Sequence, residues 1–331
     1  MNKQTILLTG FHYMRKTLLL LGMILVLGFW TYKNRFSLAT YSAPNVENLP
    51  EANGLMYVES ELSYSELAVN LYKDTMMPVF QEIDFQQIAR ENQQYIPPTT
   101  TLFYLNTPLT VKLIQLNPLI GLDLPVRLTL YQTERQRTFL TSMSPQYLLR
   151  RYGLNDPKLN RELEGYMNEL FGLIGEEKPD TILRKLVVPK EGIKMKMANG
   201  SFEEVLTRFE QAIERNSHYR KVFELDYVEL AQEQETIIPP TKLFVAGNLV
   251  DGITAVQGSQ TLGLDEIPQK LLVFERDGEV WIAYNDLAYN LKRHRTSLSP
   301  RALNNLQHDV EWLVNQVAGD YPQALWTRIK R

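Results

Sequence analysis

The sequence predicts an α+β protein in which two tandem β-α-β4-α domains follow an N-terminal membrane helix. Three observations support this prediction. Short motifs recur at one constant spacing, the apolar residues of each copy follow strand and helix periods in the same order, and an apolar run stands near the amino terminus. The length of 331 residues is enough for two or three domains.

The internal repeat is visible in motifs that lie 142 residues apart. Glu82-Ile83-Asp84-Phe85 is echoed by Glu224-Leu225-Asp226-Tyr227, and 224 minus 82 gives 142. The same spacing relates Gly121-Leu122-Asp123 to Gly263-Leu264-Asp265. This period is too long for a solenoid unit and indicates two complete domains. We place them at residues 54–154 and 192–297, with a helical linker at 155–191 and a C-terminal helix at 298–331.

An apolar run of 13 residues, Leu18–Trp30, follows directly after Arg15 and Lys16. As a helix of about 20 Å it is shorter than the roughly 30 Å hydrocarbon core, so its length alone suits the apolar region of a signal peptide. The nearest small-x-small pattern, Ser37-Leu38-Ala39, lies nine residues further on, which favours an uncleaved anchor.

Residues 1–36 are therefore interpreted as a signal-anchor or signal peptide, and residues 37–53 as a polar tether. Residues 1–35 carry five basic side chains and no acidic one, while the remainder holds 30 basic and 38 acidic residues. The positive-inside rule then predicts a single-pass protein with a cytoplasmic amino terminus and extracytoplasmic domains, periplasmic in a bacterium. The acidic remainder predicts no nucleic-acid partner. Met1 and Met14 are both candidate starts.

The elements of the first copy follow from its periodicities. Apolar residues at helical spacing predict a helix from Tyr64 to Leu71, and Pro97-Pro98 precedes a strand because proline fits the start of a strand but not its centre. The predicted elements are strand 55–58, helix 64–71, strand 79–85, a short polar helix 86–93, strands 101–106, 126–132 and 138–142, and helix 145–152.

The second copy repeats this order. Ser201 and Glu204 form a capping-box pattern before its first helix, and Asp277-Gly278 indicates a tight hairpin. After this copy, Ser299-Pro300 begins a last helix. The predicted elements are strand 193–197, helix 202–213, strand 222–227, short helix 228–234, strands 243–247, 271–276 and 280–284, and helix 287–294.

Several kinds of chemistry are excluded by the composition and the motifs. The chain has no cysteine, which removes disulfides, thiolate zinc sites and cysteine nucleophiles. The four histidines are scattered, and neither a phosphate-binding glycine loop nor a G-x-S-x-G motif occurs. We therefore expect no cofactor and no metal, and the sequence identifies no catalytic residue.

The repeated motifs resemble the domain of unknown function 302 family. The resemblance rests on the capped first helix, the Pro-Pro-Thr strand start, the Gly-Leu-Asp-x-Pro turn and the ending Tyr284-Asn285-Asp286…Arg293-His294 of the second copy. It implies a fold similar to the TATA-binding-protein architecture, with helices on one face of an antiparallel sheet. It implies no established reaction, and Phe85 and Tyr227 stand where many members carry a histidine.

The candidate ligand-binding residues lie in the second copy. An arginine and a histidine one helical length from an aspartate could hold an anion or perform acid–base chemistry. The structural alternatives are that Asp286 caps a helix, that Arg293 pairs with a carboxylate of the sheet, and that the other aspartates occupy turns. The candidates are Asp226, Asn248, Asp265, Tyr284, Asn285, Asp286, Arg293 and His294.

We expect a membrane-anchored extracytoplasmic binding or accessory module whose two repeats pair as an intramolecular pseudo-dimer. The expected partners are the membrane, through the N-terminal helix, and either a small anionic ligand or another envelope protein. Two alternatives remain open: an enzyme with a site around Asp286, Arg293 and His294, and an envelope scaffold that uses the two extra helices.

Overall fold

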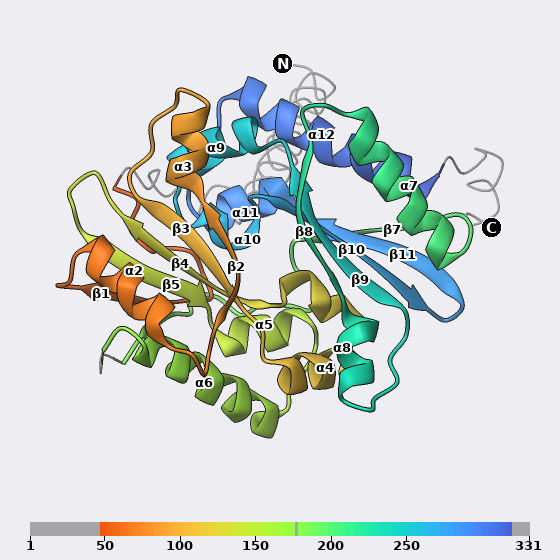
Figure 1. The fold of residues 1–331 in the computed structure, drawn as a ribbon, viewed down its shortest axis with the longest axis horizontal. Coiled ribbons are helices and arrows are strands. Elements are labelled where there is room, and N and C mark those ends of the chain that lie inside the picture. The colour runs from red at the N-terminus through yellow and green to blue at the C-terminus, as the bar shows by residue number, and fades with distance from the viewer. Residues whose placement is uncertain (1–46, 176–177, 320–331) are drawn as a thin grey trace, which may run out of the picture. The chain divides into compact units, whose positions relative to one another are not determined.

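The computed structural model describes residues 47–175 and 178–319, which belong to one compact unit. The predicted anchor lies outside these residues, as do most of the tether and residues 320–331 of the predicted C-terminal helix. Within the described ranges, no helix combines the length and apolar character that crossing a membrane requires. Two antiparallel sheets carry helices around and between them (Figure 1), so the predicted α+β class is confirmed.

The first repeat builds a six-stranded sheet in which every neighbouring pair is antiparallel. All five strands predicted for this repeat are present, and the linker adds a sixth. The strands, in their order across the sheet, are β2 (Val79–Asp84), β3 (Thr99–Tyr104), β4 (Val126–Gln132), β5 (Thr138–Met143), β1 (Leu55–Ser60) and β6 (Asp180–Ile182).

The second repeat builds a five-stranded antiparallel sheet with the corresponding order but without a counterpart of β6 among the described residues. The predicted Asp277-Gly278 turn joins its two central hairpin strands. The strands, in their order across the sheet, are β7 (Ile193–Met197), β11 (Glu279–Asn285), β10 (Gln269–Arg276), β9 (Thr241–Gly247) and β8 (Arg220–Asp226).

Capping boxes begin the first helix of each repeat, α2 (Tyr64–Lys73) and α7 (Phe202–Arg215). The Ser201 hydroxyl accepts from the Glu204 amide at 3.4 Å, and the Glu204 carboxylate accepts from the Ser201 amide at 2.7 Å. These reciprocal bonds satisfy amides that have no partner within the helix. The capping box predicted from the sequence is confirmed.

A helix between the third and fourth strands of each repeat was not predicted, and the predicted β-α-β4-α order omits it. Helices α4 (Thr107–Leu116) and α9 (Leu249–Gly258) follow β3 and β9, and Asn106 and Asn248 cap them. The apolar residues of both helices spread over more than half of the circumference, so their amphipathic period is weak. A strand-ending asparagine was the available signal, because asparagine is a favoured N-cap.

The two faces of each sheet have different neighbours. In the second sheet, Phe244 and Ile282 pack with α7 and with α12 (Pro300–Ala318). Leu243 and Leu272, on the opposite face, join the core cluster that also contains the first repeat. Helices therefore cover one face of the second sheet, as predicted. The first repeat covers its other face.

Corresponding helices make corresponding contacts between the repeats. Helix α3 (Phe85–Glu91) packs against α9, and α8 (Tyr227–Glu233) packs against α4. The remaining helical segments are the 3-10 helix η1 (Pro118–Asp123), α5 (Pro145–Arg151), α6 (Pro157–Gly172), α10 (Leu262–Asp265) and α11 (Leu287–Arg293).

Two glycines allow an aromatic ring of one repeat to lie against the backbone of the other. A Cβ atom on Gly121 would stand 2.8 Å from the Tyr227 ring, and one on Gly263 would stand 2.7 Å from the Phe85 ring. Both the glycines and the aromatic residues are 142 positions apart, so these two contacts are equivalent.

We expect Gly121→Ala to destabilise the protein by about 1–3 kcal/mol, because the added methyl group overlaps Tyr227 and Leu272. Gly165→Ala is the matched control, since this α6 glycine has open space around it and alanine favours helices. Urea denaturation measures both variants. Equal stability of the two variants would show that the repeats are not packed closely at Gly121.

Candidate functional site

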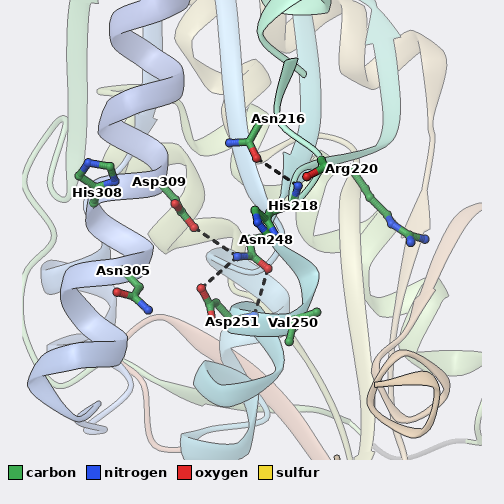
Figure 2. A pocket seen from close by; sticks show the side chains of 10 residues that line it. Asn216, His218, Arg220, Asn248, Val250, Asp251, Asn305, His308 and Asp309 are labelled. Carbon is green, nitrogen blue, oxygen red and sulfur yellow. Dashed lines mark hydrogen bonds between the residues drawn. The ribbon is translucent and has the colours of Figure 1, made fainter. Parts of the chain in front are cut away.

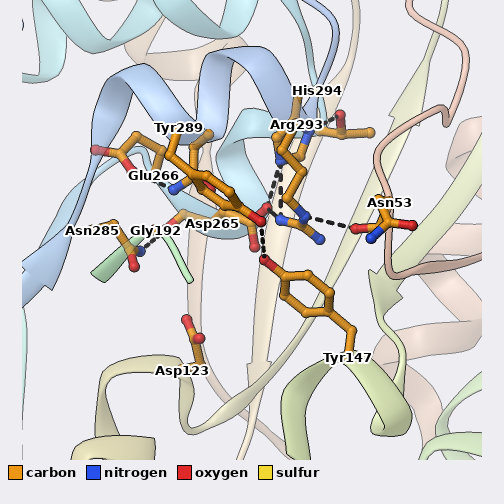
Figure 3. A network of polar contacts seen from close by, with 12 residues as sticks. Asn53, Asp123, Tyr147, Gly192, Asp265, Glu266, Asn285, Tyr289, Arg293 and His294 are labelled. Carbon is orange, nitrogen blue, oxygen red and sulfur yellow. Dashed lines mark hydrogen bonds and ion pairs between the residues drawn. The ribbon is translucent and has the colours of Figure 1, made fainter. Parts of the chain in front are cut away.

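A network of buried charges lies between the two repeats (Figure 3). It contains every Asp, Glu, Lys and Arg side chain that is buried within residues 47–175 and 178–319. Burying so many charges is costly unless each one is paired. The members are Asp123, Arg127, Arg151, Asp265, Glu266, Lys270 and Arg293.

Asp123, at the end of η1, is the centre of the first half of the network. Its carboxylate pairs with Arg151 at 2.5 Å, with Lys270 of the second repeat at 3.0 Å and with Arg127 at 3.1 Å. The Tyr152 hydroxyl donates to it at 2.6 Å. Burial acts to raise the pKa of Asp123, but the charges of Arg151, Lys270 and Arg127 outweigh it and hold that pKa well below its ordinary value.

Asp265, at the end of α10, holds the equivalent position in the second repeat. It pairs with Arg293, and its carboxylate lies 2.5 Å from Nε2 of His294. Burial again acts to raise the pKa of the carboxyl group, and the Arg293 charge and the His294 hydrogen bond lower it overall. Burial also lowers the pKa of His294, although Asp265 opposes that shift.

The two arginines bind backbone carbonyls that directly precede the opposite repeat. Nε of Arg151 donates to the Glu191 carbonyl at 2.9 Å, and Nε of Arg293 donates to the Asn53 carbonyl at 2.7 Å. Asn285 links the halves, because it accepts from Arg151 at 2.8 Å and donates to the Asp265 carbonyl at 2.9 Å. The network therefore joins the repeats as well as neutralising its own charges.

For Glu266 and Lys270, neighbouring charges and hydrogen bonds do not offset the cost of burying a charge. Burial raises the pKa of Glu266 to about 7, although Asn290 donates to its carboxylate at 2.6 Å. Burial and the nearby Arg127 charge lower the pKa of Lys270 to about 8. Both shifts oppose ionisation, as expected where desolvation dominates.

The structure brings together four of the candidate residues, Asp265, Asn285, Arg293 and His294. Their side chains are closed off from the surface, with exposures of 1% for Arg293 and 0% for His294. A substrate has no surface at which to reach them, so this geometry does not favour an enzyme site there. The network had one unused signal in the sequence: Arg127 stands between apolar residues of a predicted strand, and Lys270 stands directly before another.

The other candidates lie apart from the network. Asp286 caps α11 and accepts from the Ala288 amide at 3.0 Å, and Asp226 caps α8. The capping alternative is therefore confirmed for Asp286. Tyr284 is partly buried and packs against the core between the second sheet, α7 and α12. Asn248 caps α9 and lines a surface pocket.

This surface pocket, of about 520 Å³, lies between the loop before β8, the start of α9, and α12 (Figure 2). The Asn248 amide group donates to Asp251 at 3.0 Å and to Asp309 at 3.5 Å. Burial raises the pKa of Asp309. The lining residues are Asn216, Ser217, His218, Arg220, Asn248, Val250, Asp251, Asn305, His308 and Asp309.

The first repeat has a corresponding pocket of about 440 Å³ between the start of α4 and α6. Pro157 and Pro300 begin α6 and α12, so positions in these helices correspond at a spacing of 143. Gly165 and Tyr166 of the first pocket therefore match His308 and Asp309 of the second. The second repeat places an imidazole and a carboxylate at these two positions, where the first repeat has glycine and tyrosine.

A smaller pocket of about 170 Å³ adjoins the one in the second repeat and shares His218, Arg220 and Val250 with it. Its other side includes Ile88 and Glu91 of the first repeat. Across the part of the chain that the structure describes, no three His, Asp or Glu side chains are grouped so as to hold a metal ion.

Comparison with known proteins identifies a family model, described as "Domain of unknown function DUF302", that matches residues 60–170 and 193–311. A crystal structure of an uncharacterized conserved DUF302 protein from Bacillus stearothermophilus is 21% identical, with a TM-score of 0.32, and the match covers 37% of this chain and 95% of that chain.

Curated relatives include the fluoride-specific ion channels FluC 1 of Brucella suis biovar 1 and FluC 1 of Brucella abortus biovar 1. Each is 31% identical over 141 residues, which cover 41% of this chain and 54% and 51% of the two relatives. The chain thus spans about half the length of the curated relatives that it matches.

We expect Glu266→Gln to remove a loss of stability at high pH. Burial raises the pKa of Glu266 from an ordinary 4.5 to about 7, so between these values the folded chain keeps a proton that the unfolded chain releases. The free energy of unfolding contributed by this group therefore falls as the pH rises. Glutamine cannot ionise, and the variant should match the parent at pH 4 and exceed its stability by about 1–3 kcal/mol at pH 8.

Urea denaturation at both pH values tests this expectation. Glu279→Gln, at an exposed position of β11, is the control and should leave the pH dependence unchanged. An unchanged pH dependence in Glu266→Gln would contradict the assignment.

Proposed function

Since the chain belongs to the DUF302 family, with two copies of the family domain in tandem, we propose that it is a binding module whose repeats form an intramolecular pseudo-dimer. Its ligand site is the pocket of the second repeat, and a membrane anchor holds the module outside the cytoplasm. The observation that carries the proposal is that equivalent contacts join the two repeats. In this arrangement one face of each sheet lies against the other repeat, and the pockets on the outside of the two repeats are free to differ.

The equivalent contacts support the pseudo-dimer. The Tyr227 ring lies against Gly121 and the Phe85 ring against Gly263. The two arginine-to-carbonyl bonds, from Arg151 and Arg293, likewise cross the interface in both directions. An interface in which one patch of each partner meets its counterpart is the pattern of a twofold dimer.

Other contacts occur in one direction only, as fusion of two copies permits. The Tyr227 hydroxyl donates to the carbonyls of Gly121 at 2.7 Å and Leu124 at 2.9 Å, whereas Phe85 has no hydroxyl. Lys270 pairs with Asp123 across the interface at 3.0 Å. These contacts therefore make the two halves of the interface unequal.

The pocket of the second repeat suits a small anion that also carries hydroxyl or amino groups. Arg220 has no ion-pair partner among the described residues and borders both adjoining pockets, so it is free to bind an anionic group. Asp251 and Asp309 keep lone pairs that can accept from hydroxyl or amino groups. The first repeat offers Leu109 and Tyr166 in place of these carboxylates.

The anchor is supported by the apolar run Leu18–Trp30 and by the basic residues before it. The relatives named fluoride-specific ion channels support a second candidate, an accessory role beside a membrane protein that handles ions. This candidate corresponds to the envelope partner expected from the sequence.

Tyr227→Phe tests the pseudo-dimer. Removal of the hydroxyl leaves two carbonyls of the other repeat without their donor, so we expect a loss of about 1–2 kcal/mol in urea denaturation. Tyr131→Phe is the matched control, because its buried hydroxyl has no hydrogen-bond partner among the described residues and its loss should be neutral or stabilising. Equal effects would argue against cross-repeat hydrogen bonds.

Arg220→Ala tests the ligand site. We expect gluconate, an anion with hydroxyl groups, to shift the amide resonances of residues 216–220 and 248–251 and to bind more tightly than acetate. Loss of a charge-assisted contact should weaken gluconate binding at least about tenfold. Arg215→Ala, nearby on α7 but outside the pocket, should leave it unchanged. If gluconate causes no shift in these amides, or binds Arg220→Ala as well as the parent, the site is excluded.

A further inference from the structure

The loop between β6 and β7 places apolar side chains on the surface. Leu183, Leu186 and Val188 stand within six positions of one another and are 41%, 71% and 53% exposed. A single exposed apolar side chain is common in proteins, but a group of them in one segment is typical of a surface that contacts a partner or a membrane. The loop is therefore a candidate contact surface.

The same loop is basic. Residues 181–190 include Arg184, Lys185 and Lys190 and no acidic residue, whereas the chain after residue 35 has more acidic than basic side chains. All three basic residues are exposed. Lys185 pairs with Glu191 at 2.5 Å, while Arg184 and Lys190 form no ion pair with any described residue. Two positive charges of the loop thus remain available to an anionic partner.

The backbone of the loop is held in place by the residue that ends the predicted tether. The Arg184 amide donates to the Asn53 side-chain oxygen at 2.7 Å, and the Asn53 side-chain amide donates to the Lys185 carbonyl at 3.3 Å. The Val187 side chain is buried in the core cluster that contains the first repeat. The loop therefore presents its apolar and basic side chains from a fixed backbone, which lowers the entropy cost of binding.

The predicted anchor is joined to the module through the tether that ends beside this loop. Sixteen residues, 31–46, separate the apolar run from Glu47. A chain of that length spans at most about 55 Å, so an anchored module stays near the bilayer. Tethering over such a distance gives an effective concentration on the order of 1 mM, at which even a weak contact is populated.

We propose that residues 183–190 contact the surface of an anionic membrane. The apolar side chains of the loop enter the headgroup region and its basic side chains bind lipid phosphates, a combination typical of protein segments that lie at membrane interfaces. The positive loop matches a negative lipid surface, which the acidic remainder of the module would repel. The inference rests on the anchor proposed above and adds a second contact, which fixes the orientation of the module on the membrane.

Site-directed fluorescence tests the contact, because the chain has no cysteine. Leu186→Cys carries an environment-sensitive fluorophore, and the full chain is reconstituted in vesicles of phosphatidylglycerol and phosphatidylcholine that contain a lipid with a nitroxide headgroup. We expect quenching about threefold stronger than for the same label at Ile237→Cys, since a label in the headgroup region lies within reach of the nitroxide. Ile237 is the matched control because it is an apolar residue, 93% exposed, in the loop before β9. Equal quenching at the two positions would overturn the proposal.

Neutralising the loop tests the charge requirement. Arg184→Gln, Lys185→Gln and Lys190→Gln together should reduce the quenching at Leu186→Cys to the level found in vesicles of phosphatidylcholine alone. A control variant replaces three exposed basic residues elsewhere by glutamine and should keep the quenching; these are Lys158, Arg161 and Arg215. Unchanged quenching in the loop variant, or in vesicles without phosphatidylglycerol, would contradict the contact.

Flotation of the vesicles in alkaline carbonate reports on the anchor separately. A chain that stays with the vesicles but shows no excess quenching at Leu186→Cys would support the anchor and overturn this inference. A chain that carbonate releases would contradict the anchor, and excess quenching before the carbonate wash would then still support the loop contact. Release without excess quenching would exclude both.

Discussion

The pairing of the buried Asp123 and Asp265 carboxylates with neighbouring bases, in which Lys270 reaches Asp123 from the other repeat, is the constraint on which the rest of the structure depends. Four basic and three acidic side chains are buried together, and Glu266 gives up part of its charge because burial raises its pKa to about 7. An uncompensated buried charge costs several kcal/mol. The repeats must therefore stay in the one arrangement in which Lys270 reaches Asp123, so the network fixes the pairing that the apolar core stabilises.

The two halves of the interface differ in polarity. On the inner face of the first sheet, Thr101 and Thr129 share a hydrogen bond of 2.8 Å, whereas Leu243 and Leu272 occupy the same register in the second sheet. The Gln260 side-chain amide donates to the Thr99 hydroxyl of the first repeat at 2.7 Å. The residue of the first repeat that corresponds to Gln260 is Pro118, which cannot make such a bond. A homodimer would have to use the same residues on both sides, but a fused pair can make one half polar and the other apolar.

Local patterns in the sequence were enough to predict the strands, the capping box at Ser201 and the Asp277-Gly278 hairpin. They failed where the other repeat decides the environment. Helix α4 has apolar residues over more than half of its circumference, so its amphipathic period is weak. Lys270 occupies the interior because its carboxylate partner, Asp123, comes from the other repeat. The sequence placed Arg293 and His294 beside Asp286, whereas in the structure both contact Asp265 and Asp286 caps α11. It also could not show that a second domain closes over them.

Closure of the inner faces determines where a ligand can bind. Side chains at the interface serve pairing, and their change would disturb the buried charges of both repeats. The pockets at the starts of α4 and α9 face outward, and a change there leaves the network intact. His308 and Asp309 of α12 correspond to Gly165 and Tyr166 of α6, so the two outer pockets differ in charge. The buried arginine–aspartate pair, in contrast, is equivalent in the two repeats. Binding specificity is therefore free to reside in one repeat while both repeats hold the fold.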